Sequence, residues 1–506
     1  MDEKNVSTII ADSNYGRIQG RSQNGISVFR GIPFAKPPIG PLRFRAPQAP
    51  DSWKGVRPAT GFGPGCVQGV NPFQEVIPIN VPYTSEDCLY LNVWTPSLEG
   101  SRPVMVWIHG GGFVVGAGSE DVYAQGSEIL ARRGDVVLVT LNYRLGALGF
   151  LHGKTLCGEK LDSSGNEGVL DQLAALRWVQ ENISSFGGDP SNVTIFGQSA
   201  GAICVSAILG MPSAKGLYHR AIMESSGTAS QLITPEQASL VTVAILKAAG
   251  LTADKASKLR EISATDLAGM GMTAILAGGF FPVIDGEMLP RSTYDAIRDG
   301  ETRGVPIIIG TTVDEQKLFD ILDPSIASLD EAGLLTRAEG MAPGHGQSAA
   351  DLYRNARRSR GESVTPPDLY SAMQTDKEYR YPTMRLGELQ AQLTPDTYAY
   401  LFTWNKSPVM GGALGAFHGI DVPFQFRLDD NWFCPEARAG AETLSRKIQD
   451  AWLAFARTGN PSHTNLPSWI PYDANRRATM ILDEICQVQD APREQERSFW
   501  QSLAES

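Results

Sequence analysis

Cysteine is scarce in this chain. Only 6 of its 506 residues are cysteines, and none of them form a C-x-x-C pair. The sequence therefore offers neither the ligand spacing of a zinc ribbon nor a redox dithiol.

Long apolar runs are missing as well. The longest ones, such as 136–141, have only the length of a strand, whereas a membrane helix needs about 18 or more apolar residues. We expect no membrane-spanning segment.

Basic residues are also in deficit. The chain has 44 Lys and Arg against 55 Asp and Glu, a formal net charge of −11, which argues against a nucleic acid partner.

The stretch 1–5 lacks the basic and apolar regions of a secretory signal. We therefore expect a cytoplasmic protein as the chain is given, and a secreted one if a signal peptide was removed from it. The 42% apolar and 20% charged residues are typical of a folded globular protein.

Short apolar runs alternate with helix-length segments from Pro103 onward. Runs of β-forming residues that do not alternate with polar ones indicate strands covered on both faces, as in a mainly parallel sheet with crossover helices. The sequence predicts a large doubly wound α/β sheet, with helices at about 169–183 and 444–456. The predicted strands are 26–29, 89–94, 104–108, 136–140, 193–196, 221–223, 306–309, 397–402 and 480–482.

Between about 325 and 383 the apolar runs become fewer, and charged residues, Gly and Pro increase. We interpret this stretch as a helical insertion that caps the sheet. Its basic cluster at 354–360 could bind anions, but in an acidic protein a solvated helix face is the favoured interpretation. The whole chain, 1–506, is then one domain that carries this insertion.

The segment 197–201 reads Gly-Gln-Ser-Ala-Gly and lies between a predicted strand and a predicted helix. In the pattern G-x-S-x-G, small residues allow a strained strand-to-helix turn from which the serine hydroxyl protrudes. An ordinary turn could carry the same letters by chance in a Gly-rich chain. The flanking strand and helix favour a nucleophile elbow with Ser199 at its tip.

A serine nucleophile needs hydrogen-bond donors for the oxyanion that forms on the attacked carbonyl. The segment 109–113, His-Gly-Gly-Gly-Phe, follows the predicted strand 104–108, as expected of the HGGG-type loop of lipases and esterases. A phosphate-binding loop is the competing interpretation. The nearby glycines fit neither G-x-G-x-x-G nor G-x-x-x-x-G-K-[ST], so a nucleotide site is disfavoured.

The serine also needs a base and an acid that follow it in the chain. His418 lies in a Gly-rich segment after the strand 397–402, whereas the other histidines have no suggestive neighbours or lie in the glycine loop. Asp314 and Glu315 follow the strand 306–309, and the order Ser, acid, His is the one expected of such a sheet. The residues alone do not choose between the two acids.

Several further motifs resemble the type B carboxylesterase family, which includes cholinesterases and para-nitrobenzyl esterase. They run in register from about residue 14 to residue 490: Gly-Ile-Pro-Phe-Ala at 31–35, Ser-Glu-Asp-Cys-Leu-Tyr-Leu-Asn-Val-Trp at 85–94, Asn-Tyr-Arg at 142–144 and Phe-Gly-Gly-Asp-Pro at 186–190. The resemblance implies the α/β-hydrolase fold. It also implies a serine carboxylesterase that hydrolyses carboxylic esters through an acyl-enzyme intermediate, with no metal or organic cofactor.

The same resemblance implies roles for particular residues. Ser199 would be the nucleophile, Glu315 rather than Asp314 the acid, and His418 the base. The oxyanion-hole N–H groups would come from Gly111, Gly112 and Ala200, and Ser225 would supply a hydroxyl close to the acid and the histidine.

The resemblance further suggests structural pairs, and among the departures of this chain from the family pattern one bears on the substrate. The pairs are an Arg43–Glu86 ion pair, an Arg144–Asp171 ion pair and the Cys66–Cys88 disulfide of secreted members; from the residues alone, two buried thiols are an equal alternative to that disulfide. The departure is Gln198, which stands where cholinesterases carry a glutamate. Because 66–88 also contains no tryptophan to hold a quaternary ammonium, a choline ester is a poor substrate candidate.

The expected partner is a small ester molecule. Five phenylalanines flank the catalytic segments and are candidates for the substrate pocket, with plain core packing as the alternative: Phe113, Phe280, Phe281, Phe319 and Phe417. A carbamate or aryl-amide hydrolase with the same triad is an alternative function. A binding or adhesion module without catalysis is another, because the same fold hosts recognition proteins.

Overall fold

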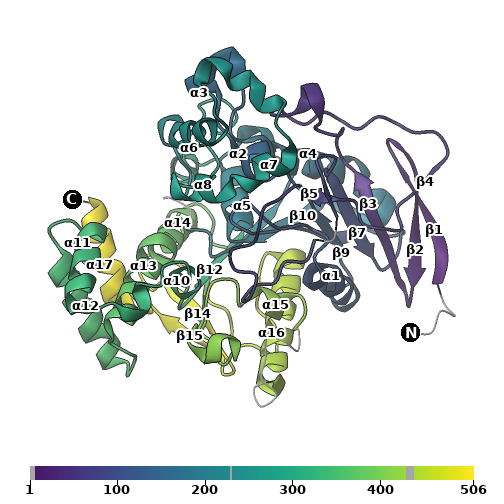
Figure 1. The fold of residues 1–506 in the computed structure, drawn as a ribbon. Helices are drawn as coiled ribbons and strands as arrows, with labels where there is room; N and C mark the ends of the chain where they lie inside the picture. The colour runs from purple at the N-terminus through teal and green to yellow at the C-terminus, as the bar shows by residue number, and fades with distance from the viewer. Residues whose placement is uncertain (1–5, 82, 228–230, 429–437, 506) are drawn as a thin grey trace.

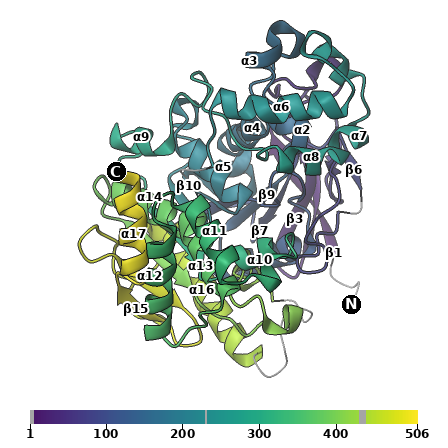
Figure 2. The same ribbon diagram turned by 60° about the vertical axis from the view of Figure 1, so that its left-hand side comes forward.

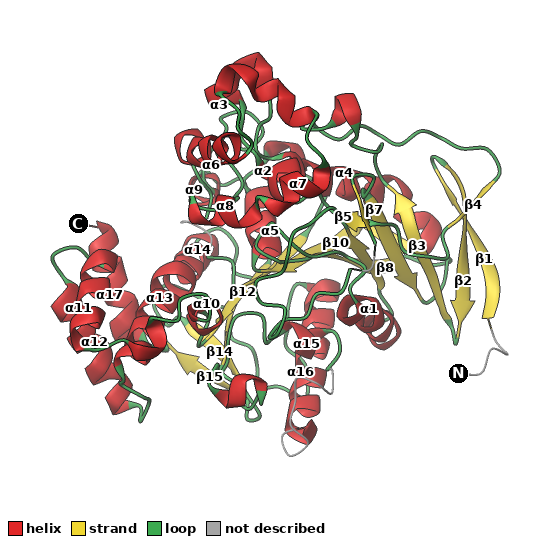
Figure 3. Ribbon diagram, viewed as in Figure 1, coloured by secondary structure: helices red, strands yellow, loops and turns green. Residues whose placement is uncertain are grey.

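A computed structural model describes residues 6–81, 83–227, 231–428 and 438–505 of the chain. Its centre is a large twisted sheet with helices on both faces (Figures 1 and 3). The strand order is β1-β2-β3-β7-β9-β8-β10-β11-β12-β13-β14-β15, and β4 pairs with β2 outside this path.

The middle of the sheet is parallel from β9 to β14. These strands are β8 (Arg102–Ile108), β9 (Val137–Leu141), β10 (Gly188–Gln198), β11 (Arg220–Glu224), β12 (Ile307–Thr312), β13 (Thr397–Phe402) and β14 (Ala478–Leu482). Each contains one of the apolar runs from which a strand was predicted, so the predicted parallel core is confirmed. The runs do not alternate with polar residues because both faces of these strands are buried.

The alternation of side chains along one strand shows how the two faces are covered. In β8, Val104, Val106 and Ile108 belong to one core cluster, and Met105 and Trp107 to the other. The first cluster includes α4 (Glu167–Asn182) and α5 (Ala200–Leu209). The second includes α1 (Asp121–Gly134) and α16 (Arg438–Thr458). The sheet is therefore doubly wound, as the sequence predicts.

Antiparallel strands extend the sheet at both ends. At the N-terminal end are β1 (Val6–Ser13), β2 (Gly16–Gln23), β3 (Ile26–Pro33) and β7 (Tyr90–Thr95), with the short β4 (Val56–Pro58). At the other end β15 (Gln487–Asp490) pairs with β14. A separate small sheet joins β5 (Gly65–Cys66) and β6 (Thr84–Ser85). In the residues described, no helix has the length and apolar character needed to cross a membrane.

Further helices connect and cover the central strands. They are α2 (Gly146–Phe150), α3 (Lys154–Cys157), α6 (Pro235–Ala248), α7 (Ala264–Gly269), α8 (Gly271–Leu276), α9 (Thr293–Arg298), α10 (Gln316–Asp320) and α15 (Val422–Gln425).

The stretch predicted as a helical insertion contains α11 (Glu331–Met341), α12 (Gly346–Ser359) and α13 (Pro366–Thr375), followed by a π-helical turn (Asp376–Arg380) and α14 (Tyr381–Ala391). α11, α12 and α13 form a third core cluster with the C-terminal helix α17 (Glu494–Glu505). Figure 2 shows these helices side by side at one end of the molecule. They pack mainly on one another, while α14 contacts β12 and β13.

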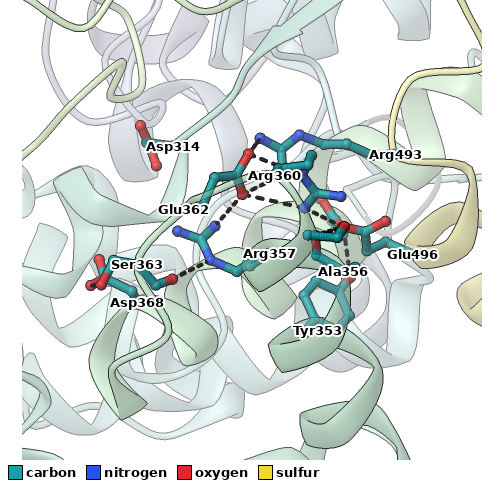
Figure 4. Close-up of polar contacts among 12 residues, drawn as sticks. Asp314, Tyr353, Ala356, Arg357, Arg360, Glu362, Ser363, Asp368, Arg493 and Glu496 are labelled. Atoms are coloured by element: carbon teal, nitrogen blue, oxygen red, sulfur yellow. Dashed lines mark hydrogen bonds and ion pairs between the residues drawn. The ribbon is translucent and has the colours of Figure 1, made fainter.

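The basic cluster in this region is not a freely solvated helix face. Arg357 is buried and lies 3.4 Å from Glu362, while Arg360 lies 3.0 Å from Glu362 and 2.5 Å from Glu496 (Figure 4). Arg493 lies 2.6 Å from Glu362. Glu362, just after α12, and Glu496, in α17, therefore partner these arginines and tie α12 to the start of α17.

Candidate active site

Ser199 lies at the turn between β10 and α5. Its backbone has φ 56° and ψ −127°, outside the regions that residues with side chains usually occupy. The turn is fixed from both sides, because the Ser199 N–H donates to Glu224 O at 2.9 Å and the Ser199 carbonyl accepts from Ile203 N at 2.9 Å. The serine is held in the strained conformation of a nucleophile elbow.

The glycines on either side of this turn are required by the neighbouring strand. A Cβ atom at Gly201 would lie 2.0 Å from Ile108 O, and one at Gly197 would lie 2.7 Å from the same oxygen. No side chain fits at either position without moving the backbone of β8. The G-x-S-x-G pattern therefore reflects the close approach of β8 to the turn.

The glycine loop after β8 has an unusual backbone. Gly111, Gly112 and Phe113 all have positive φ, at 103°, 61° and 64°. The Gly111 carbonyl accepts from Val114 N and Val115 N, each at 3.1 Å, which closes the loop into a tight turn. In the described part of the chain, the N–H groups of Gly111, Gly112 and Ala200 form no hydrogen bond of their own.

His109, the first residue of this loop, is held in place by Tyr143. Its ring stacks on Tyr143 at 4.4 Å between centroids, and the Tyr143 hydroxyl donates to His109 O at 2.8 Å. Burial lowers the pKa of His109 to about 4, so the ring is neutral near pH 7. A neutral buried ring leaves the glycine loop without a fixed charge beside it.

His418 and Glu315 meet above the carboxyl ends of β12 and β13. The Nδ1 atom of His418 lies 2.6 Å from Glu315 Oε2, and both side chains are buried. The other Glu315 oxygen, Oε1, accepts from Thr312 N at 2.7 Å and from the Ser225 hydroxyl at 2.5 Å. Both oxygens of this carboxylate are therefore hydrogen-bonded, which fixes its orientation.

Asp314 points to a different partner. Its carboxylate accepts from Ala416 N at 3.1 Å, and its own N–H donates to Ala416 O at 3.0 Å. Asp314 therefore holds the backbone of the segment that carries His418, while the neighbouring residue Glu315 contacts the imidazole.

A cavity of about 280 Å³ opens at this site. Ser199, Ala200, His418, Gly111 and Gly112 all line it. Among the described residues, no Asp, Glu, Lys or Arg lines this cavity. Its wall is apolar apart from the catalytic groups and a few amides, so it suits an uncharged, apolar molecule.

Four of the five phenylalanines proposed for the pocket line this cavity: Phe113, Phe280, Phe281 and Phe319. Phe417 does not. It is fully buried in the core cluster that includes α1 and α16. Because it precedes His418 directly and pairs with Asp314 in a β-bridge, its side chain points away from the side on which the imidazole lies.

Other residues of the cavity wall were not predicted from the sequence. They belong to the segment between Cys66 and Cys88, to the glycine loop, to α8, and to the helical segments around His418: Asn71, Pro72, Phe73, Ile77, Ile79, Val114, Ile275, Leu318, Leu322 and Tyr379. They carry no motif. The only sequence signal for them is the number of apolar residues in 66–88. An exposed loop would contain fewer apolar residues, so this segment could have been predicted to be partly buried.

Two further carboxyl groups, those of Asp421 and Glu224, are buried near His418. Asp421 accepts from the Tyr400 hydroxyl at 3.0 Å, and Glu224 accepts from Trp452 Nε1 at 2.8 Å and from Gln425 Nε2 at 2.6 Å. Burial, and then the charge of Glu315, raise the pKa of Asp421 to about 6. Burial and Asp421 raise the pKa of Glu224 well above its ordinary value.

Both suggested ion pairs are present. Arg43 Nε donates to Glu86 at 2.7 Å, and Arg144 binds Asp171 through contacts of 2.7 and 2.8 Å. Cys66 and Cys88 are buried side by side as free thiols rather than as a disulfide. Their hydrogen bond and their burial raise the pKa of Cys88 well above its ordinary value.

Comparisons with known proteins confirm the resemblance. The model of the carboxylesterase family matches residues 7–500. Para-nitrobenzyl esterase of Bacillus subtilis (strain 168) is 40% identical over 503 residues, covering 96% of this chain and 97% of that protein. Cocaine esterase of Homo sapiens is 35% identical, covering 89% of this chain and 82% of that protein.

Solved structures agree with these relatives. A carboxylesterase of Geobacillus stearothermophilus superimposes with a TM-score of 0.85 at 37% identity, covering 97% of this chain and 99% of the other. The comparisons do not favour the alternatives of a carbamate or aryl-amide hydrolase or of a module that only binds.

Proposed function

The chain belongs to the carboxylesterase family, has the α/β-hydrolase fold and is a serine carboxylesterase; we propose that Ser199, Glu315 and His418 are its catalytic triad. The observation that carries this proposal is the 2.6 Å contact between His418 and Glu315 at the edge of a cavity that also exposes Ser199.

The triad acts in two half-reactions. His418 takes the proton of the Ser199 hydroxyl as its oxygen attacks the ester carbonyl, and Glu315 stabilises the imidazolium that forms. The imidazolium then protonates the departing alcohol, and an acyl-enzyme remains. Water, deprotonated by His418, attacks the acyl-enzyme and releases the acid and the free serine.

The oxyanion of each tetrahedral intermediate accepts hydrogen bonds from the N–H groups of Gly111, Gly112 and Ala200. These three groups have no other partner in the described residues and border the same cavity. Donors that are already in place need no reorganisation when negative charge develops on the substrate oxygen.

The substrate is an uncharged carboxylic ester with an apolar acyl or alcohol group. Phe113, Phe280, Phe281 and Phe319 provide aromatic surface in the cavity. The cavity has neither a tryptophan, the strongest cation–π partner, nor a carboxylate among its described lining residues, so it is poorly suited to a cationic alcohol.

We also propose a single hydrolase domain over 1–506, with the helices within 325–383 as an insertion, and a cytoplasmic location. A cytoplasmic location predicts that Cys66 and Cys88, which are hydrogen-bonded to each other, are thiols in the isolated protein, since disulfides persist mainly in oxidising compartments. This thiol state is tested by counting the alkylatable cysteines in the unfolded protein with and without prior reduction. Equal counts are expected.

Covalent capture of the nucleophile tests the proposed triad. The purified protein is treated with a para-nitrophenyl alkylphosphonate and digested, and the peptides are analysed by mass spectrometry. We expect one phosphonyl group on Ser199, no label in Ser199→Ala, and much slower labelling of His418→Gln. Labelling of another serine at the same rate in the wild type and in Ser199→Ala would refute the assignment.

A further inference from the structure

Gln198 reaches the nitrogen that has to take the proton of the nucleophile. It is the last residue of β10, directly before Ser199, and only 7% of its surface is exposed. Its Nε2 atom lies 3.1 Å from Nε2 of His418. Since Nδ1 of the same ring contacts Glu315, both nitrogens of the imidazole have a partner.

The chemistry of these partners defines the protonation state of the ring. The Glu315 carboxylate only accepts hydrogen bonds, so Nδ1 of His418 carries a hydrogen. Nε2 of a neutral ring then offers a lone pair, and the Gln198 amide, which lies there with its NH₂ group, donates to it. In an imidazolium, Nε2–H would face the N–H of this amide, donor against donor.

Resting on the triad proposed above, we propose that Gln198 is a positioning residue whose amide holds His418 neutral, in the tautomer that can act as a base, before the substrate binds. The contact also fixes the plane of the imidazole, because the ring is then held at both nitrogens.

The same contact is lost when the ring takes up a proton. When Nε2 of His418 has taken the proton of Ser199, it becomes a donor, and the amide N–H that faces it has no acceptor there. A glutamate at this position, the residue that cholinesterases carry, only accepts. It would favour the imidazolium already in the resting enzyme, where the protonated ring cannot act as a base.

Other charged or titratable groups around His418 are the same in all Gln198 variants. Glu315 contacts the ring directly, Asp421 follows it on the same segment, and the Tyr379 ring lies 5.2 Å from it. Asp421 is itself hydrogen-bonded to Tyr400. Because burial raises the pKa of Asp421 to about 6, Asp421 contributes to the acidic limb of the activity in every variant, and the difference between variants is the informative quantity.

The test compares kcat/KM for para-nitrophenyl butyrate across pH in the wild type, Gln198→Glu and Gln198→Met. We expect Gln198→Glu to shift the midpoint of the acidic limb upward by about 1–3 pH units, as a carboxylate within hydrogen-bond reach of a histidine does. Activity would then recover at alkaline pH. Gln198→Met, which removes the donating amide without adding a charge, should shift the midpoint upward by less.

Gln231 supplies a matched control. It lines the same cavity and, in the described structure, makes no hydrogen bond to His418. Gln231→Glu therefore adds the same charge to the cavity without the contact, and we expect a much smaller shift than in Gln198→Glu. Equal shifts in both variants would assign the effect to cavity charge in general and overturn the role of Gln198.

A second readout does not depend on turnover. The His418 ring is followed by NMR during a pH titration of protein with ¹⁵N-labelled histidine, and its signals are assigned by their loss in His418→Gln. We expect its titration to move upward in Gln198→Glu. Unchanged titration and unchanged acidic limbs in folded Gln198 variants would overturn the inference, whereas an inactive wild type with a shifted titration would count against the proposed triad alone.

Discussion

Replacing Arg144 with methionine should strongly destabilise the protein, because the change leaves the charge of Asp171 buried without its partner. The exposed fractions of the two side chains are 2% and 0%. Arg144 donates to Asp171 from Nε at 2.8 Å, from Nη2 at 2.7 Å and from its backbone N–H at 3.0 Å. Only the backbone contact survives the substitution.

Removing one partner of a buried ion pair costs about 3–5 kcal/mol. Burial already raises the pKa of Asp171, and loss of the guanidinium raises it further, so the folded variant keeps a proton that the unfolded chain releases. The stability of Arg144→Met therefore falls as pH rises from the unfolded pKa of Asp171 through the folded one. We expect a larger loss of stability at about pH 8 than at about pH 5.

Urea unfolding of both proteins at the two pH values measures this loss. Arg298→Met is the matched control, since Arg298 pairs with Asp295 on the surface with exposed fractions of 50% and 52%, and it should cost about 0–1 kcal/mol. Arg144→Met combined with Asp171→Leu should regain much of the loss, because no unpaired charge remains. A cost for Arg144→Met as small as that of the control would refute the reasoning.

Three further changes test the site and its surroundings. Ser225→Ala removes the 2.5 Å hydrogen bond to Glu315, and steady-state kinetics should show kcat reduced about 10- to 100-fold with little change in KM, since a hydrogen bond to a charged group contributes about 1.5–3 kcal/mol. Gly111→Ala places a Cβ 2.0 Å from Val115 O and should lower kcat about 100-fold through loss of an oxyanion donor, more than Gly112→Ala, whose Cβ would lie at an ordinary contact distance of 3.9 Å from Val114 Cγ2. Burial raises the pKa of Glu120 to about 7, so the wild type loses stability as pH rises through that value, and Glu120→Gln should raise the melting temperature more at about pH 8 than at about pH 5.

Each of these has a clear contrary result. Unchanged kcat in Ser225→Ala would mean that the hydroxyl does not orient Glu315 during turnover. Equal activities of the two glycine variants would show that the steric argument for the loop is wrong. A melting temperature of Glu120→Gln that differs from the wild type by the same amount at both pH values would exclude titration of a buried carboxyl as the cause.

The central strands and the nucleophile turn could be predicted because their signals are local. Strands such as 104–108 and 397–402 are continuous apolar runs, and a strand covered on both faces needs nothing else. The glycines around Ser199 are required by the carbonyl of Ile108, and this requirement appears in the sequence as a recognisable pattern.

The choice between Asp314 and Glu315 could not be made from the residues. The two are adjacent, and the backbone direction at the start of α10 decides which carboxylate meets His418 and which meets Ala416. The prediction that Phe417 lines the substrate pocket failed because of backbone direction as well. Successive residues of an extended segment point to opposite sides, so His418 faces the cavity and Phe417 does not.

Contacts between residues that are distant in the chain could not be predicted either, because they depend on tertiary packing. The arginines at 357 and 360 bind Glu362 and Glu496, and the second of these is more than a hundred positions away in the chain. The cavity wall from 71–79 and α8 likewise consists of ordinary apolar residues that only tertiary packing brings to the catalytic serine.

Hydrolysis of a para-nitrophenyl ester series from acetate to decanoate, by the wild type beside Ser199→Ala, tests the central claim most directly. We expect the wild type to turn over these esters, with a preference that reflects the apolar cavity, and a folded Ser199→Ala variant to lose nearly all of this activity. Equal turnover by the wild type and by folded Ser199→Ala would contradict the account.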